Sequence, residues 1–157
     1  GIADTFGTAF GKSQLAAGNG LPSSGKVMVT VNKGDKEGAV GIARRFHAMG
    51  FGIVATEGTA AHLAAAGVPS QSVFKVSEGR PHAIDLMVNG EIQLLINTPL
   101  GKASQRDDYS MRQAAVANRV PYTTTLTGAS AACAAIEAAR STPAAVRSLQ
   151  EWQAQLS

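Results

Sequence analysis

Residue types that bind anions recur along this sequence wherever a short apolar run ends. The clearest segment is Thr56-Glu57-Gly58-Thr59. Its two hydroxyls can donate hydrogen bonds, its glycine lets the backbone approach a ligand closely, and a helix beginning there adds amide donors and a positive dipole end. Lys36 and Lys75 would add charge-assisted hydrogen bonds if the fold brings them to the same place. This chemistry predicts a site for a phosphorylated small molecule.

The candidate binding residues carry a hydroxyl, an amide or a cation, apart from one glycine that exposes its backbone. They are Lys36, Thr56, Gly58, Thr59, Lys75, Arg80, Asn97, Thr98, Thr124 and Thr125. An alternative is that Thr56 and Thr59 only cap the helix that follows them. The motif alone does not separate the two interpretations. The repetition of phosphate-binding residue types in several loops favours the ligand.

Residues suited to catalysis are scarce. The sequence contains no P-loop, no zinc-ligand spacing and no Gly-x-Ser-x-Gly. Cys133 lies in an Ala-rich helical segment and is interpreted as a small buried hydrophobe. His47 and His62 lie inside helical patterns, whereas His82 follows a strand, with Asp85 placed to orient its ring. We therefore predict neither a catalytic residue nor a metal site, and only His82 is a histidine candidate for ligand contact.

From residue 26 onward, short β-branched or apolar runs alternate with helical patterns. Strands are expected at residues 26–32, 52–55, 72–76, 92–97 and 121–124. Helices are expected from Asp35 to Gly50, in the short stretch that ends at Ala66, near 108–118 and at 129–140. Another is expected to have Pro81 in its first turn, and a last one is expected to open at Pro143 and hold a packed Trp152. The pair Asp107-Asp108 is interpreted as a helix N-cap.

Five strands alternating with helices predict the α/β fold class, as a three-layer α/β/α domain around a five-stranded parallel sheet of Rossmann-like type. In such sheets, ligands bind just outside the carboxyl ends of the strands. The candidate binding residues lie at the ends of predicted strands or after them. The sequence therefore places them at a common edge of the sheet.

Composition limits the class of protein. The chain has 157 residues, of which 45% are hydrophobic and 16% charged, with a formal net charge of +3. No apolar run reaches the roughly 18–20 residues of a membrane span. A single cysteine cannot build a disulfide framework, and the few excess cations are scattered rather than clustered for nucleic-acid binding. We expect one soluble, cytoplasmic domain that binds neither nucleic acid nor a membrane.

The first residues differ from the rest. A brief helical pattern near residues 2–15 runs into a linker rich in Gly, Asn, Pro and Ser. The chain begins with Gly rather than Met. These features predict a piece cut from a longer protein.

The strand-end motifs resemble those of the C-terminal allosteric domain of the carbamoyl-phosphate synthase large chain, whose fold is named after methylglyoxal synthase. The resemblance covers about residues 26–152, and its motifs occur in the family's order. They are Gly34-Asp35-Lys36-Glu37, Ala55-Thr56-Glu57-Gly58-Thr59, Lys75-Val76-Ser77-Glu78-Gly79-Arg80-Pro81-His82, Asn89-Gly90-Glu91, Ile96-Asn97-Thr98 and Tyr122-Thr123-Thr124-Thr125-Leu126.

The resemblance implies a regulatory domain rather than a catalytic one. In this family the whole enzyme makes carbamoyl phosphate for pyrimidine and arginine synthesis, with ATP, Mg or Mn and a glutaminase small subunit, and its terminal domain binds effectors such as UMP, IMP or ornithine. It implies that residues 1–24 are the last helix and linker of the preceding synthetase domain and that 25–157 bind the effector. By motif, the nucleotide would be held by Lys36, Thr56, Thr59, Lys75 and Asn97, and Thr98 belongs to the same loop.

Two positions depart from the family pattern. Relatives activated by ornithine have an Asp where this sequence has Thr123, and a neutral side chain cannot pair with the amino groups of ornithine. The resemblance therefore does not carry ornithine binding over to this loop. Pro99 stands where nucleotide-binding members often have a second Thr, and it removes a hydroxyl and an amide donor. We expect nucleotide binding of altered strength or preference.

Two alternatives belong to other functional classes. Methylglyoxal synthase uses this fold as a lyase acting on dihydroxyacetone phosphate, with a carboxylate base in a Gly-Gly-Asp loop. Here that loop reads Ser-Glu-Gly-Arg-Pro-His, so Glu78 would have to serve as the base. The other alternative is a module that makes the chain a homo-oligomer without binding a ligand.

Overall fold

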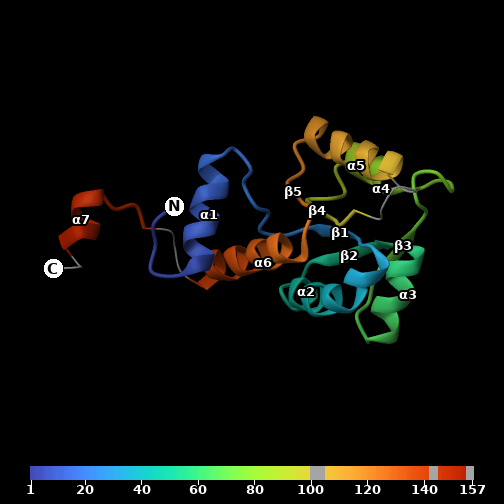
Figure 1. Ribbon diagram of the computed structural model, residues 1–157, viewed down its shortest axis with the longest axis horizontal. Helices are drawn as coiled ribbons and strands as arrows, with labels where there is room; N and C mark the ends of the chain where they lie inside the picture. Colours follow the sequence, from blue (N-terminus) through green and yellow to red (C-terminus); the bar gives the residue numbers. More distant parts are fainter. Residues whose placement is uncertain (100–104, 142–144, 155–157) are drawn as a thin grey trace.

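The computed structural model describes residues 1–99, 105–141 and 145–154. Five parallel strands form one sheet in the order β3-β2-β1-β4-β5, flanked by helices (Figure 1). The elements are α1 (Phe6–Ala16), β1 (Lys26–Thr30), the 3-10 turn η1 (Lys33–Asp35), α2 (Lys36–Ala48), β2 (Gly52–Thr56), α3 (Glu57–Ala65), β3 (Gln71–Val73), α4 (Ala83–Val88), β4 (Leu94–Asn97), α5 (Gln105–Ala117), β5 (Tyr122–Thr123), α6 (Leu126–Ser141) and α7 (Leu149–Ala154). The predicted fold class is confirmed.

The central strands are apolar on both faces because helices cover both sides of the sheet. All four residues of β4 are buried, as are the last four of β1. In the parallel register Val29 lies beside Ile96, and Thr30 lies beside Asn97. Two polar residues therefore end the two central strands side by side, at the carboxyl edge of the sheet.

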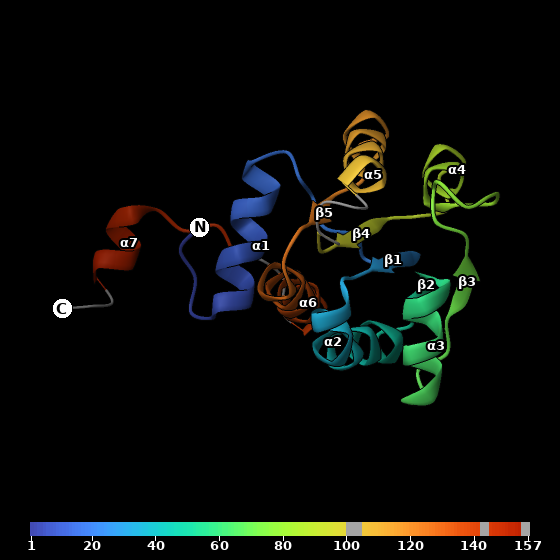
Figure 2. The same cartoon turned by 45° about the vertical axis from the view of Figure 1, so that its right-hand side comes forward.

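Two apolar cores lie on opposite faces of the sheet. On one face, α2, α3 and α6 bury side chains such as Phe46, Leu63 and Ile136 against the strands. On the other, α4 and α5 bury Met87 and Met111. Figure 2 shows these two helical layers, above and below the strands, which complete the predicted α/β/α arrangement.

Helix α1 packs on α6, outside the three layers, where a glycine allows close approach. A Cβ at Gly7 would lie 2.5 Å from the carbonyl oxygen of Ala134, so only a bare backbone fits there. Thr5 caps α1 by accepting a hydrogen bond from the Thr8 amide. Figure 1 shows α7 beyond α1, on the side away from the sheet. Nζ of Lys12 and Cζ of Arg147 lie over the ring of Trp152 on α7, at 5.9 and 5.0 Å from its centroid.

Two predicted helix starts are wrong. The last helix begins at Leu149, and residues 145–148 are not helical; Pro143 itself lies outside the described residues. Helix α4 begins at Ala83 rather than with Pro81 in its first turn, because His82 is its N-cap. None of the described helices is both long and apolar enough to span a bilayer.

Candidate functional site

The order of the strands creates a topological switch point between β1 and β4. From β1 the chain proceeds outward through β2 to β3 and then returns to the other side of β1 as β4. The connections on the two sides therefore diverge at the carboxyl ends of β1 and β4, which is where ligands bind in open parallel sheets. Thr30 and Asn97 meet at this position in the register, and both are buried.

Thr98 organises the loop that follows β1. Its Oγ1 accepts hydrogen bonds from the backbone amide and the Nδ2 of Asn32, at 3.0 and 3.2 Å. Asn32 in turn caps η1 by accepting from the Asp35 amide at 3.0 Å. Because Lys36 begins the next helix, Thr98 helps fix where that lysine lies. Thr98, a predicted binding residue, therefore helps to position Lys36, which is another.

Asn97 is a buried polar residue with one unsatisfied hydrogen-bond acceptor among the described residues. Its Nδ2 donates to Oδ1 of Asp108 on α5 at 3.0 Å. Its Oδ1 has no hydrogen-bond partner among the described residues, although Asn97 is fully buried. A buried acceptor left in this state costs about 1–3 kcal/mol, so a donor supplied at this position would be stabilising.

The predicted convergence of Lys36 with the segment after β2 is present. Nζ of Lys36 donates to the carbonyl oxygen of Gly58 at 2.7 Å. Thr56 and Thr59 are buried, with their Oγ1 atoms 3.5 Å apart, which is long for a hydroxyl pair. We call these four residues, Lys36, Thr56, Gly58 and Thr59, the anion cradle.

The interpretation that these threonines only cap α3 is not supported. Thr56 occupies the N-cap position of α3, but its side chain accepts no hydrogen bond from the first turn of the helix. A side chain at residue 58 would also crowd the cradle, since a Cβ there would lie 3.2 Å from Nζ of Lys36. The two threonines and the carbonyl that binds the Lys36 ammonium all lie at the start of α3, which is the positive end of the helix dipole.

The loop of residues 75–80 stands beside the anion cradle and is tied at both its base and its tip. At the base, the amide of Phe74 donates to the carbonyl of Pro81 at 3.2 Å. At the tip, the amide and hydroxyl of Ser77 donate to Oδ2 of Asp107, at 3.2 and 2.7 Å. Within the loop, Nζ of Lys75 contacts Oε1 of Glu78 at 2.5 Å. The carboxylate of Glu78 therefore pairs with Lys75, the lysine that was predicted to bind phosphate.

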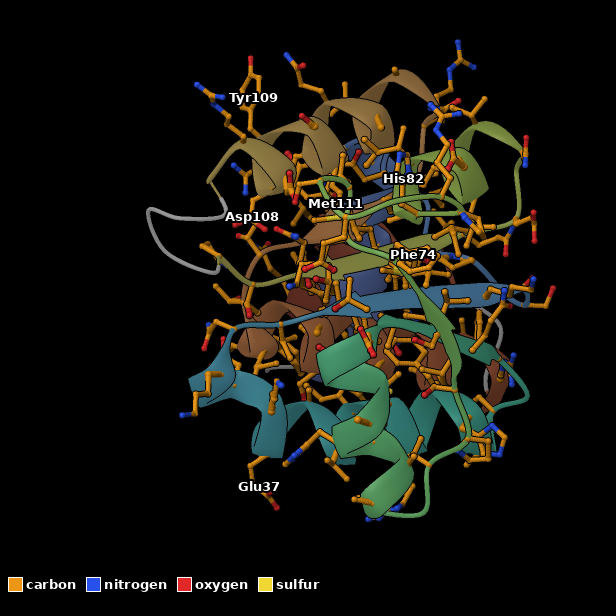
Figure 3. All side chains as sticks on the ribbon, turned by 90° about the vertical axis from the view of Figure 1, so that its right-hand side faces the viewer. Glu37, Phe74, His82, Asp108, Tyr109 and Met111 are labelled. Atoms are coloured by element: carbon orange, nitrogen blue, oxygen red, sulfur yellow. The ribbon has the colours of Figure 1, made fainter. Side chains whose placement is uncertain are left out.

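A small cavity lies where the carboxyl ends of β1, β2 and β3 meet. Its volume is about 10 Å³, which is close to the minimum that one water needs. Figure 3 views this side of the molecule and shows Phe74 and Met111 in the middle of it, with Tyr109 on the outer side of α5. The cavity is lined by Thr30, Thr56, Phe74, Lys75, Val76, Ala83, Asp107 and Met111. The predicted approach of Lys75 to Thr56 is thus present, and phosphate would require the cavity to open.

Three predicted site residues belong neither to this cavity, nor to the anion cradle, nor to the pair Asn97 and Thr98. Arg80 is exposed, and its Nη1 lies 3.3 Å from Oδ1 of Asp85 on α4. Thr125 accepts a hydrogen bond from the amide of Gly128 at 3.0 Å, in the first turn of α6. Thr124 is exposed beside it. A role of these residues in ligand binding stays a prediction.

His82 and Cys133, the titratable residues considered for catalysis, have structural roles. His82 is buried and forms a capping box with Asp85: Nδ1 accepts from the Asp85 amide, and Oδ2 of Asp85 accepts from the His82 amide. The expected association of His82 with Asp85 is confirmed. Burial raises the pKa of the Cys133 thiol to about 11, which keeps it protonated and unreactive at neutral pH. Its interpretation as a buried hydrophobe is confirmed.

The predicted N-cap role of the acidic pair Asp107-Asp108 is wrong. Asp107 and Asp108 lie in the first turn of a helix that begins at Gln105, and neither is its N-cap. Asp107 anchors the loop through Ser77, and Asp108 pairs with Asn97. Thr30 and Phe74 were missed altogether. A polar residue ending an apolar strand was an available signal for Thr30.

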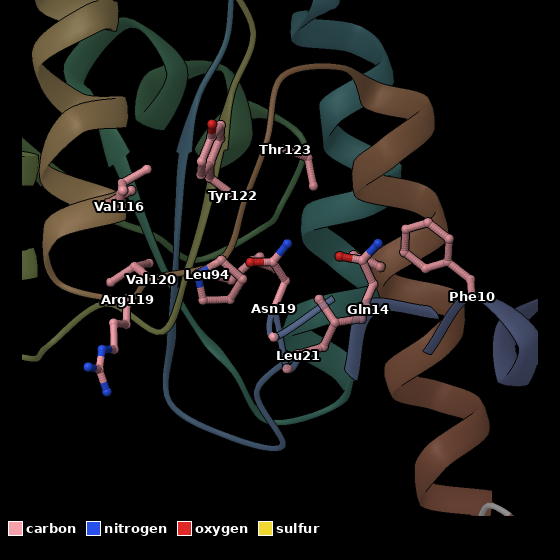
Figure 4. Close-up of a pocket in the computed structure, with 15 residues that line it drawn as sticks. Phe10, Gln14, Asn19, Leu21, Leu94, Val116, Arg119, Val120, Tyr122 and Thr123 are labelled. Carbon is pink, nitrogen blue, oxygen red and sulfur yellow. The ribbon is translucent and has the colours of Figure 1, made fainter. Parts of the chain in front are cut away.

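A much larger cavity lies elsewhere, between α1, the segment after it, α5 and β5 (Figure 4). Its volume is about 540 Å³, and it is lined by residues such as Phe10, Asn19 and Leu21. Leu94, at the amino end of β4, is also part of its wall. It shares no residue with the anion cradle and does not belong to the strand-end site.

Comparisons with known proteins agree with this geometry. The MGS-like domain family matches residues 38–124. That range includes Thr56, Thr59, Lys75 and Asn97, while Lys36 lies just before it.

Relatives with high identity carry one name. A carbamoyl phosphate synthase large chain from Gemmatimonas aurantiaca is 60% identical over 152 residues, which are 97% of this chain and 14% of the relative. One from Myxococcus xanthus is 46% identical over the same shares. The carbamoyl phosphate synthase large chain, C-terminal section, of Methanopyrus kandleri is 50% identical over 138 residues, which are 87% of this chain and 26% of that protein.

The chain thus spans about one-seventh of the length of the large chains that it matches. The matched range covers more than half of the chain and includes β2, β3, β4 and β5 completely, whereas β1 lies before it. The chain belongs to the MGS-like domain family, and its high-identity relatives are carbamoyl phosphate synthase large chains.

Proposed function

We propose that this chain is the allosteric regulatory domain of a carbamoyl phosphate synthase large chain and that it binds a nucleoside monophosphate, UMP or IMP. The observation that carries the proposal is the anion cradle: the ammonium of Lys36 is bonded to the first turn of α3, the same turn where the buried threonines Thr56 and Thr59 lie. A phosphate placed there gains a charged partner, hydroxyl donors and the helix amides together.

The neighbouring groups suit the remainder of a nucleotide. Asn97 has a buried oxygen without a donor, and a sugar hydroxyl or a base N–H is a donor of the required kind. Lys75 lines the cavity with Thr56 and can exchange the carboxylate of Glu78 for a phosphate. Pro99 is exposed after Thr98 and has no amide hydrogen to offer, which supports an altered nucleotide preference.

Catalysis is assigned to the rest of the parent protein. In this proposal the synthetase domains of the same chain use ATP with Mg or Mn, and a glutaminase small subunit delivers ammonia, all in the cytoplasm. Residues 1–24 would be the end of the preceding synthetase domain, which is supported by the packing of α1 on α6 outside the sheet layers. A regulator in this position acts by binding one arrangement of the parent more tightly than another.

The lyase alternative has no comparable support. Its base would have to be Glu78, whose carboxylate is engaged by Lys75 on an exposed loop. We propose that this domain has no catalytic activity of its own. Release of methylglyoxal from dihydroxyacetone phosphate by the purified chain would contradict that proposal.

Calorimetric titration of the chain with UMP and with IMP tests the binding proposal. We expect saturable binding that the double variant Thr56→Ala/Thr59→Ala abolishes. The matched control is Thr5→Ala/Thr8→Ala, which removes two threonines with the same spacing at the start of α1. Binding that survives the first double variant, or no saturable binding below millimolar concentrations, would contradict the proposal.

A further inference from the structure

Phe74 presents an aromatic ring at the edge of the candidate site. It follows β3 directly, and its side chain is 48% exposed, whereas Val73 before it is buried. Its ring contributes to the small cavity that Thr56 and Lys75 also line. A large apolar side chain is therefore half-open to solvent immediately beside the anion cradle.

The backbone that carries the Phe74 ring is held in place. The backbone of Phe74 is bonded to the carbonyl of Pro81 and forms a parallel bridge with His82. A Cβ at Gly79 would lie 3.4 to 3.7 Å from three carbons of the ring, which is ordinary van der Waals contact. Gly79 thus passes this side of the ring without covering it with a side chain. A ring on a fixed backbone loses less freedom when a ligand packs on its open side.

A second, open recess adjoins the same ring. It has a volume of about 210 Å³ and is lined by Glu57, Ser72, Val73, Phe74 and Pro81. Glu57 is the residue next to Thr56, so this recess borders the anion cradle. Phe74 therefore lines both the small cavity beside the anion cradle and an open space that has apolar and polar residues in its walls.

We propose that Phe74 is the residue on which the planar base of the ligand stacks while its phosphate occupies the anion cradle. The inference rests on the proposed function and adds the reason for choosing a nucleotide over a simpler phosphate. Aromatic rings accept any base on their faces, because every base has a π-face. Phe74 is thus a specificity residue for base-bearing phosphates, and sugar phosphates gain nothing from it.

The test compares three probes on the same chain: UMP, ribose 5-phosphate and inorganic phosphate. By calorimetry, Phe74→Ala is expected to weaken UMP binding roughly 5- to 150-fold, which is the range for loss of one base–aromatic stack. Ribose 5-phosphate and inorganic phosphate should bind as to the unmodified chain. Phe74→Tyr keeps a ring and should keep UMP affinity.

The matched control is Tyr109→Ala, which removes a ring with 57% exposure on the outer side of α5 (Figure 3). It should leave the affinity for all three probes unchanged. A direct readout comes from Phe74→Trp, because the chain has a single natural tryptophan, Trp152 on α7. The new indole fluorescence should change with UMP and stay constant with ribose 5-phosphate.

The outcomes separate the two proposals. If Phe74→Ala leaves UMP affinity unchanged, or weakens ribose 5-phosphate equally, stacking is overturned while the anion cradle stands. An indole signal at position 74 that ignores UMP at saturating concentration also overturns stacking. If the unmodified chain binds none of the three probes, the proposed function fails and this inference fails with it.

Discussion

The ammonium of Lys36 lies 2.7 Å from the carbonyl oxygen of Gly58 and so joins the first residue of α2 to the first turn of α3. This contact brings together the segments that follow two adjacent strands. It also places a cation beside the first turn of α3, the end of the helix whose amides favour an anion. The candidate site depends on this relationship more than on any single hydroxyl.

Removing that cation should weaken binding without unfolding the domain. Lys36→Met is expected to lower affinity for UMP about 10- to 100-fold, the effect of losing one charged hydrogen bond. Lys33→Met is the control, because Lys33 is an exposed lysine in the adjacent 3-10 turn. Calorimetry on both variants measures the difference, and equal affinities would remove Lys36 from the site.

Glu78 should act as an internal competitor of the ligand. Its carboxylate lies 2.5 Å from Nζ of Lys75, and both side chains are nearly half exposed. Neutralising it in Glu78→Gln frees the lysine, so affinity for UMP should rise about two- to fivefold, the scale of an exposed ion pair.

The control for this experiment is Glu91→Gln, which breaks a similar exposed pair with Lys26 at the opposite end of β1. It should leave UMP affinity unchanged. Weaker binding by Glu78→Gln would show instead that Glu78 orients Lys75 for the ligand.

Two glycines on α1 should respond oppositely to the same substitution. A Cβ at Gly7 would lie 2.5 Å from the carbonyl oxygen of Ala134, so Gly7→Ala should destabilise the fold by about 1–3 kcal/mol. At Gly11 a Cβ would meet only the Cβ of Ala135 at 3.5 Å. Gly11→Ala should therefore stabilise by about 0.5–1 kcal/mol through helix propensity. Urea denaturation measures both, and equal effects would contradict the close packing of α1 on α6.

The pair between Arg45 and Glu137 should make stability depend on pH. Its hydrogen bonds, with Nη2 to Oε2 at 2.7 Å, lower the pKa of Glu137 below its ordinary 4.5. A lowered folded-state pKa adds stability above the ordinary value, and this stability is lost as pH falls through the lowered value. The unmodified chain should therefore exceed Glu137→Gln in stability at neutral pH and lose that advantage as the pH falls below the ordinary pKa of 4.5 and through the lowered one.

The size of this effect is limited by solvent. Both side chains are about 40% exposed, so the difference at neutral pH should stay under about 1 kcal/mol. Thermal melts of the two proteins at several pH values measure it. An advantage that grows on acidification would contradict the assigned direction of the pKa shift.

The sheet could be predicted from the sequence because its strands are short apolar runs followed by polar residues. The segments ending at Thr56 and Asn97 illustrate this pattern, and both residues lie at the carboxyl edge. Helix starts were less predictable. His82 caps α4 through a pairing with Asp85 that replaces the more common Ser or Thr cap. Pro81 therefore misleads as a start signal.

The candidate site could be predicted only in part, because its cross-chain partners are set by tertiary packing. The approach of Lys36 to Gly58 follows from the adjacency of β1 and β2. The roles of Asp107 and Asp108 do not follow from their spacing, since they depend on how α5 lies over the loop at Ser77 and over Asn97. Phe74 gave no sequence signal, because an aromatic residue after a strand is ordinarily part of a core.

Amide NMR of the isotopically labelled chain during titration with UMP tests the central claim most directly, because it reports where the ligand binds. Saturable shifts are expected at Lys36, Gly58, Thr59 and Lys75, and none around the larger cavity that Asn19 and Tyr122 line. Shifts confined to that larger cavity, or no shifts at saturating UMP, would contradict the claim that the strand-end cradle binds a nucleotide phosphate.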